Sequence, residues 1–128
     1  MDILISIKPE YVHKIESGIK TFELRKRIPK INCKRYFIYS SSPEKCIVGY
    51  FYSKNILYGE PNILWEKIKN SAGIEKKLYD NYFKNKKIAY AIEISEFIKL
   101  KMKIDPKSII KNFNPPQSFC YIDGKLFL

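Results

Sequence analysis

Residues 18–27 read Gly-Ile-Lys-Thr-Phe-Glu-Leu-Arg-Lys-Arg, a segment with four cations and one carboxylate. Thr21, Glu23 and Arg25 alternate with two apolar residues, and this period of two is typical of a strand with one buried face. The pattern predicts a strand over residues 21–27 in which these three side chains point to the same side. A carboxylate held between cations on a rigid strand is a candidate site. A charged edge strand that discourages aggregation is the alternative.

The segment before this strand predicts a helix that ends at a glycine. Pro9 suits the first turn of a helix, and Val12 and Ile15 supply an apolar stripe. Gly18 is suited to the left-handed C-cap that turns the chain into the strand. His13 falls on the opposite face of this helix, so we expect it at the surface.

The remaining pattern predicts several short strands and two more helices. Gly49 inside one strand indicates a bulge or a tight bend. The elements do not alternate between strand and helix, so a doubly wound sheet is not expected. An α+β fold fits best, a small mixed β-barrel with helices at its openings. Further strands are expected at residues 3–7, 35–40, 46–53, 88–97, 98–104 and 119–122, and helices at residues 63–70 and 74–84. Asp123-Gly124 predicts a hairpin-type turn.

Length and charge limit the function classes. The chain has 128 residues, which suits one domain over residues 1–128. It carries 24 Lys and Arg against 13 Asp and Glu, a net charge of +11. Such a charge favours an anionic partner, with nucleic acid before a membrane surface, although a biased genome composition also produces lysine-rich proteins. No segment approaches the roughly 18 apolar residues of a membrane span.

Cysteine and histidine usage limits the chemistry. The three cysteines are odd in number and widely spaced, so we expect free thiols in a reducing cytoplasm rather than disulfides or a zinc site. A single histidine gives little support to a Ser-His or Cys-His nucleophile. We expect no metal site and no cofactor.

The segment 18–25 fits the pattern Gly-x-Lys-x-x-Glu-x-Arg. This pattern resembles the signature of the ASCH domain, a branch of the PUA-like barrels. Residues 3–11, 89–92 and 115–119 resemble other parts of such proteins. The resemblance therefore spans the chain. It implies a PUA-like pseudobarrel of five or six strands, with a cleft beside the signature strand.

The resemblance implies that RNA or a nucleotide binds in this basic cleft, and it leaves open a regulatory role. Arg25 can present its fork to a phosphate or a base edge, Lys20 a point charge, and Glu23 can orient Arg25. If these residues form a site, Glu23 should be partly buried and touch at least one of the two cations. Phe119 can stack on a base. The candidate binding residues are Lys20, Glu23, Arg25, Arg27, Ser40, Ser41, Ser42, Gln117, Ser118 and Phe119.

Two alternatives remain. Some ASCH proteins resemble amidohydrolases that deacylate acetylcytidine with a Lys, a Thr and a Glu, and others are described as ribonucleases. For an enzyme the candidates are Lys20, Thr21 and Glu23, although this chain has Glu23 where the amidohydrolases have their threonine. A protein-interaction module is the second alternative. The sequence leaves open whether the chain is an enzyme and whether it forms oligomers.

Overall fold

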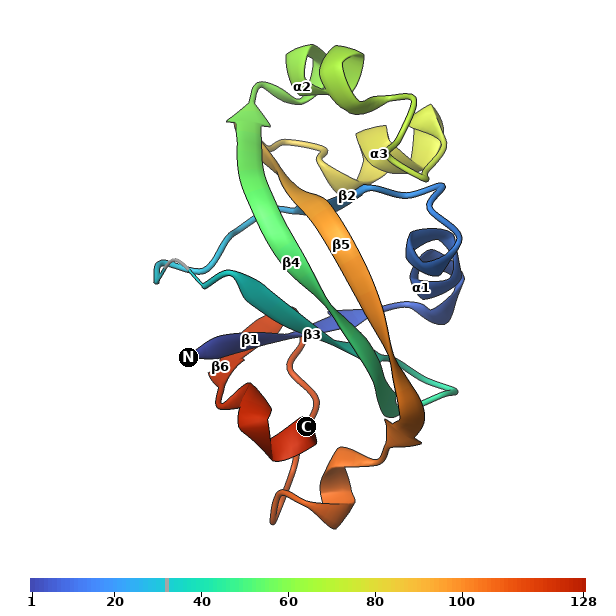
Figure 1. Cartoon of the computed structure of the whole chain (residues 1–128). Helices are drawn as coiled ribbons and strands as arrows, with labels where there is room; N and C mark the ends of the chain where they lie inside the picture. Colours follow the sequence, from blue (N-terminus) through green and yellow to red (C-terminus); the bar gives the residue numbers. More distant parts are fainter. Residues whose placement is uncertain (32) are drawn as a thin grey trace.

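A computed structural model describes residues 1–31 and 33–128, and its centre is one twisted, six-stranded mixed sheet (Figure 1). The strand order is β2-β5-β4-β3-β1-β6. Strands β1 and β3 run parallel, and the other neighbours pair antiparallel. This arrangement confirms the expected PUA-like mixed fold. The strands are β1 (Asp2–Ile7), β2 (Phe22–Arg25), β3 (Arg35–Ser40), β4 (Cys46–Gly59), β5 (Ala89–Ile104) and β6 (Phe119–Ile122).

Short helices lie at the two ends of this sheet. In Figure 1, α2 and α3 lie above the long β4–β5 pair, and α1 lies beside it. Two 3₁₀ turns follow β5 and β6, so the expected hairpin turn at residues 123–124 is wrong. Proline accounts for the starts of α1, α2 and η1, and Gly18 accounts for the end of α1. The helices are α1 (Pro9–Glu16), α2 (Pro61–Ile68), α3 (Lys76–Tyr82), η1 (Pro106–Ser108) and η2 (Gly124–Phe127).

Strand β5 is one element, where the sequence predicted two strands at residues 88–97 and 98–104. The apolar pattern changes along β5 from a continuous run to alternation because the burial of the strand changes, and not because one strand ends and another begins. At one end of β5, Ala91 and Ile92 point into different clusters of buried side chains, so both faces are covered. At the other end Lys99 and Lys101 are exposed, so only one face is covered. Strand β4 likewise runs past Ser53 to Gly59, with register shifts that absorb its bends.

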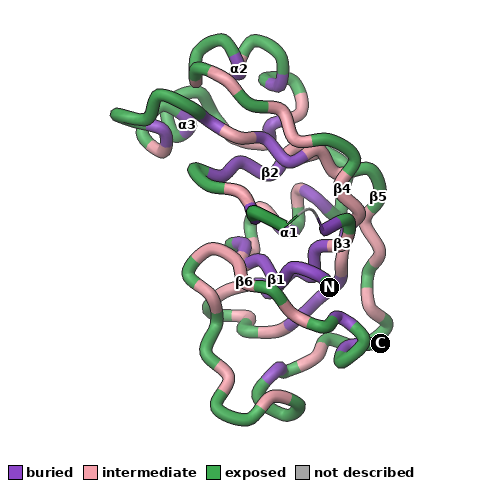
Figure 2. The backbone as a smooth tube through the Cα atoms, turned by 90° about the vertical axis from the view of Figure 1, so that its left-hand side faces the viewer, coloured by how far each residue is buried: buried purple, intermediate pink, exposed green. Residues whose placement is uncertain are grey.

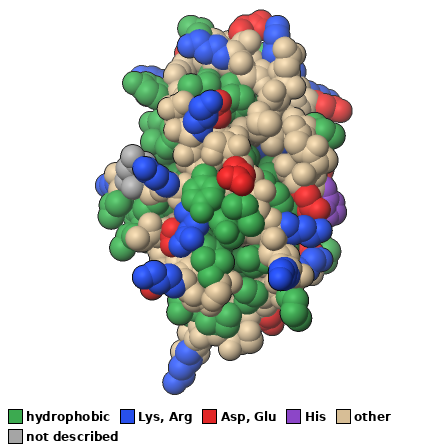
Figure 3. Space-filling view, in the orientation of Figure 1, with side chains coloured by type: hydrophobic (Ala, Val, Ile, Leu, Met, Phe, Trp, Pro, Cys, Tyr) green, Lys and Arg blue, Asp and Glu red, His purple; other side chains and the backbone are tan. Residues whose placement is uncertain are grey.

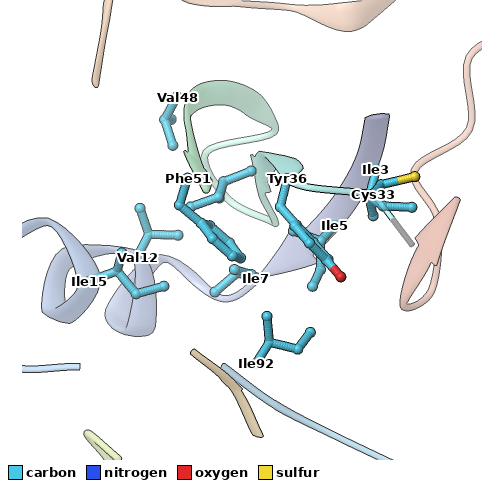
Figure 4. Close-up of a cluster of buried hydrophobic side chains, with 11 residues drawn as sticks. Ile3, Ile5, Ile7, Val12, Ile15, Cys33, Tyr36, Val48, Phe51 and Ile92 are labelled. Carbon is cyan, nitrogen blue, oxygen red and sulfur yellow. The ribbon is translucent and has the colours of Figure 1, made fainter. Parts of the chain in front are cut away.

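The main cluster of buried side chains lies between the sheet and α1. Ile5, Tyr36, Phe51 and Ile92 are at its centre, and the rings of Tyr36 and Phe51 stack with centroids 5.0 Å apart (Figure 4). Figure 2 shows buried residues concentrated along β1, β2 and β3. These strands therefore form the rigid support for any side chain at their ends.

The sheet is not closed into the small barrel that the sequence favoured. Strands β2 and β6 are the two edges of the sheet and form no ladder with each other among the described residues. Strand β2 is shorter than predicted, because it ends at Arg25 and Lys26 begins a bend. The Arg25 side chain bridges the gap instead, with a hydrogen bond to Ser118 just before β6. The sheet is therefore an open one whose seam is held by side chains.

Several local predictions are confirmed. Gly18 follows α1 with φ of 83°, the left-handed conformation expected of a C-cap. A register shift between Ile47 and Gly49 marks the predicted bulge. His13 is exposed, and the three cysteines are free thiols.

The face drawn in Figure 3 shows no single basic patch. In Figure 3, Lys and Arg side chains are spread around the edge of the molecule, with hydrophobic side chains at the centre of this view. Within the described part of the chain, the helices are too short and too polar to span a membrane.

Candidate functional site

A cavity of about 750 Å³ lies at the seam between β2 and the loop before β6. The end of β1, the start of α1, the turn after β3 and α3 complete its wall. The wall combines apolar residues with charged and hydroxyl-bearing ones, as in pockets that bind small organic molecules. Seven of the sequence-predicted residues line it: Lys20, Glu23, Arg25, Ser41, Ser42, Gln117 and Ser118.

Lys20 is buried in this wall, with 3% of its surface exposed. The turn at Gly18 places it, because the Lys20 backbone N–H donates to the carbonyl of Lys14. Its Nζ donates to the carbonyl of Ala72 at 2.6 Å and lies 3.9 Å from Oε1 of Glu23. The same Nζ lies 5.3 Å from the centre of the Tyr11 ring, which also lines the cavity. Lys20 is thus held rigidly with few ionic partners.

Burial lowers the pKa of Lys20 below its usual 10.5, because the charged amine loses its hydration. The charges of Arg25 and Lys14 lower this pKa further, and the charge of Glu23 opposes the shift. The neutral amine is therefore more populated at a given pH than it is in an exposed lysine. A neutral amine can accept a proton, which is the property a general base needs.

Glu23 and Arg25 form a buried ion pair that confirms the predicted contacts of Glu23. Only 6% of Glu23 and 8% of Arg25 is exposed. Nε and Nη2 of Arg25 donate to Oε2 of Glu23 at 3.0 and 2.7 Å. Nη2 also donates to the carbonyl of Ser6 at 2.7 Å, and Nη1 donates to Oγ of Ser118 at 3.0 Å. The guanidinium fork is therefore occupied by the protein, and Arg25 positions three segments of the cavity wall.

Four of the sequence candidates lie outside the cavity wall. Ser40 is fully buried in β3. The guanidinium of Arg27 lies over the ring of Phe119, 5.8 Å from its centre. Thr21 donates its backbone N–H to the carbonyl of Ser71. The structure therefore does not bring Arg27, Ser40, Phe119 or Thr21 to the cavity.

Other residues of the cavity were missed from the sequence. Tyr11, Asn81 and Tyr82 line the wall, and Asn81 and Tyr82 are neighbours on α3. The i, i+4 spacing of Leu78 and Tyr82 on this helix was the available signal. Among the described residues, no three His, Cys, Asp or Glu side chains gather as metal ligands would.

Gly73 was also missed. It has φ of 66° and packs against the aliphatic part of Lys20, where a Cβ atom would lie 2.6 Å from the Cβ of Lys20. A glycine that follows a helix is usually assigned to the helix end, so its sequence context gave no indication of this contact.

Comparisons with known proteins agree with the fold. The chain is 33% identical to an "ASCH domain-containing ribonuclease" of Zymomonas mobilis over 94% of this chain and 84% of that protein. A crystal structure of ASCH from Zymomonas mobilis superposes with a TM-score of 0.89 at 32% identity, covering 98% of this chain and 90% of that one. The N-terminal domain of Staphylothermus marinus McrB shares the fold, with a TM-score of 0.60 at 11% identity.

The sequence signature, the open PUA-like sheet and these relatives point to one family. The family model described as "ASCH domain" matches residues 5–98, about three quarters of the chain. This match includes the whole segment from Gly18 to Arg25 and so confirms the resemblance seen in the sequence. The chain belongs to the ASCH domain family.

Proposed function

We propose that this protein is a ribonuclease that binds one unstacked nucleotide of single-stranded RNA in the cavity and cleaves the adjoining phosphodiester. The ribonuclease name of the Zymomonas mobilis relative supports a function on RNA. The observation that carries the proposal is the buried Lys20, whose lowered pKa suits a base and whose side chain lines the cavity. A single-stranded substrate is required because a base must leave its stack to enter a cavity.

The proposed step needs only the RNA and the protein's own groups. The neutral amine of Lys20 takes the proton of the ribose 2′-OH, and the 2′ oxygen attacks the neighbouring phosphorus. The bond from phosphorus to the 5′ oxygen breaks, and the leaving oxygen receives a proton from the protonated Lys20 or from water. The products are a 2′,3′-cyclic phosphate and a 5′-OH end.

Ser118 and Arg25 stabilise the charge that develops on the phosphate. Oγ of Ser118 accepts a hydrogen bond from Nη1 of Arg25, so its own hydrogen is available to donate to a phosphate oxygen. The nearby guanidinium is buried and contributes positive charge where removal from solvent makes electrostatic effects strong. Tyr11 and Tyr82 supply aromatic surface for the base.

Two other hypotheses have less support. An acetylcytidine amidohydrolase needs a threonine at its site, and Thr21 lies outside the cavity wall. A protein-interaction module gives no reason for a lysine that is 3% exposed beside a cavity.

The test is cleavage of a labelled single-stranded RNA, with DNA of the same sequence as the control substrate. The parent protein should cleave the RNA and leave the DNA intact, and mass spectrometry should find the cyclic phosphate. Lys20→Gln should lower the rate about 100-fold or more, the size of effect expected for a general base. Lys84→Gln, at an exposed lysine outside the cavity, is the matched control.

Three outcomes would contradict the proposal. Equal cleavage of DNA would exclude attack by the 2′-OH. Saturable RNA binding without cleavage would make the protein a binding module. Deacetylation of acetylcytidine by the parent but not by Lys20→Gln would favour the amidohydrolase.

A further inference from the structure

A second cavity, of about 450 Å³, lies between the segment that follows β2 and the middle of β4. None of its lining residues lines the first cavity. Among the described residues its wall contains three lysines, Lys30, Lys34 and Lys54, and no Asp or Glu. Such a concentration of one charge favours an anion.

The wall of this cavity includes a buried tyrosine. Tyr36 is 1% exposed, and its ring is fixed against Phe51 (Figure 4). Burial raises the pKa of its hydroxyl to about 12, so the hydroxyl keeps its proton at neutral pH. A protonated hydroxyl in the wall of a cavity can donate a hydrogen bond to a ligand.

The rest of the wall suits a base rather than a bare phosphate. Ile28, Pro29 and Ile56 are apolar, and Ser53 is a polar neighbour. Tyr58 follows Ile56 by two residues on β4 and is 70% exposed. Side chains two apart on a strand share a face and lie about 7 Å from each other.

The ring of Tyr58 lies 6.3 Å from that of Tyr90 on β5. Tyr58 is exposed and Tyr90 is half-buried, and an exposed aromatic ring beside a basic cavity is a combination that suits single-stranded nucleic acid.

The two cavities lie along one segment of chain. Arg25 lines the first and Ile28 the second, and three residues span at most about 10 Å. An RNA strand that places one nucleotide in the first cavity therefore has the second within reach.

We propose that the second cavity is a nucleotide subsite for the RNA held in the first. The phosphate binds Lys30, Lys34 and Lys54, and the base packs between the apolar wall and the Tyr36 hydroxyl. This proposal rests on the proposed function, because it gives the same RNA a second point of contact. It implies that a substrate longer than the reacting nucleotides binds more tightly.

The test compares two triple variants of the full chain. One variant replaces Lys30, Lys34 and Lys54 by Ser. The control variant replaces by Ser three exposed lysines outside both cavities, Lys67, Lys101 and Lys107. Both lose the same charge. Binding is measured with 2′-fluoro RNA, which cannot be cleaved by the 2′-OH step, as a dinucleotide and as an oligomer of about eight nucleotides.

We expect the first variant to bind the longer RNA about tenfold more weakly than the control does, and the dinucleotide equally well. The slope of log affinity against log salt should fall by about 0.7, the value for one lost phosphate contact on a single strand. Tyr36→Phe keeps the ring stacking and should weaken binding of the longer RNA with an unchanged melting temperature.

Equal losses in the two triple variants would overturn the subsite, and continued RNA cleavage would show that the proposed function stands without it. A free mononucleotide that competes as well as the longer RNA would also overturn it, because the ligand would then be a nucleotide and not RNA. A parent that neither binds nor cleaves RNA would overturn both proposals.

Discussion

The backbone of Gly73 packs directly against the side chain of Lys20, with 2.6 Å between the position of a Cβ at Gly73 and the Cβ of Lys20. The neighbouring carbonyl, of Ala72, accepts the hydrogen bond from Nζ of Lys20. The segment after α2 therefore fixes both the stem and the head of this lysine. Substitutions at Gly73 should act on Lys20 without touching the cavity.

Gly73→Ala should lower the rate of RNA cleavage strongly and the free energy of unfolding only moderately. The new methyl group displaces Lys20, and φ of 66° disfavours alanine, so we expect a loss of about 1 kcal/mol or somewhat more. That corresponds to a fall in melting temperature of about 4 °C. RNA cleavage should fall about tenfold or more, as expected for a misplaced catalytic group. Gly59→Ala is the control, because a Cβ there meets nothing within 4 Å. Parent-like cleavage by Gly73→Ala would show that the position of Lys20 is not critical.

Glu23→Gln should shift the pH dependence of cleavage. The charge of Glu23 raises the pKa of Lys20, so its removal lowers that pKa further and increases the neutral amine at a given pH. The rising alkaline limb of the rate should therefore move to lower pH. Arg25 loses its ionic partner, so the free energy of unfolding should fall by about 3 kcal/mol. The measurements are rate–pH profiles and urea unfolding, and a limb that does not move would argue against Lys20 as the base.

Arg25→Lys should loosen the seam between β2 and β6. An ammonium group cannot reproduce the bonds to Glu23, Ser6 and Ser118 together, so cleavage and stability should both fall, the latter by about 2 kcal/mol. Hydrogen exchange should speed up at the Ser6 amide, which donates to the carbonyl of Ser118. Arg27→Lys serves as the comparison, since Arg27 is exposed and outside the cavity wall. Similar effects of both substitutions would show that the seam does not depend on the fork of Arg25.

The free energy of unfolding at alkaline pH should depend on the ionisation of Tyr36. Its pKa is raised from 10.0 to about 12 in the folded protein, chiefly by burial. Below pH 10 the phenol is neutral in both states. Between pH 10 and about 12 it ionises in the unfolded chain only, so the free energy of unfolding falls as pH rises.

Tyr36→Phe removes this titration, so the free energy of unfolding should fall less steeply with pH. The difference from the parent should be on the order of 1 kcal/mol at pH 11. Urea unfolding at a series of pH values measures the difference. Parallel curves for the parent and the variant would contradict the burial of the Tyr36 hydroxyl.

Patterns of local spacing predicted the parts of the site that are local. The alternation around Glu23 predicted β2 and the shared face of Glu23 and Arg25, and Gly18 predicted the turn that places Lys20. The contacts of Lys20 with Ala72 and of Arg25 with Ser118 join residues 52 and 93 positions apart. Periodicity carries no information about such distant partners.

The open sheet could not be predicted for the same reason. Alternation shows that a strand has a buried face, but it does not show whether two edge strands pair. The burial of Glu23 also depends on distant parts of the sequence, because α3 and the loop before β6 line the same cavity as Glu23.

The pairing of β1 has a consequence for the protein during its synthesis. The first strand pairs with β6, which begins at Phe119, and Oγ of Ser6 donates to the carbonyl of Pro116. A nascent chain that has not yet released these residues from the ribosome lacks one neighbour of β1 and one wall of the cavity. The cavity therefore cannot be complete until almost the entire domain has been translated, a delay that follows from topology alone.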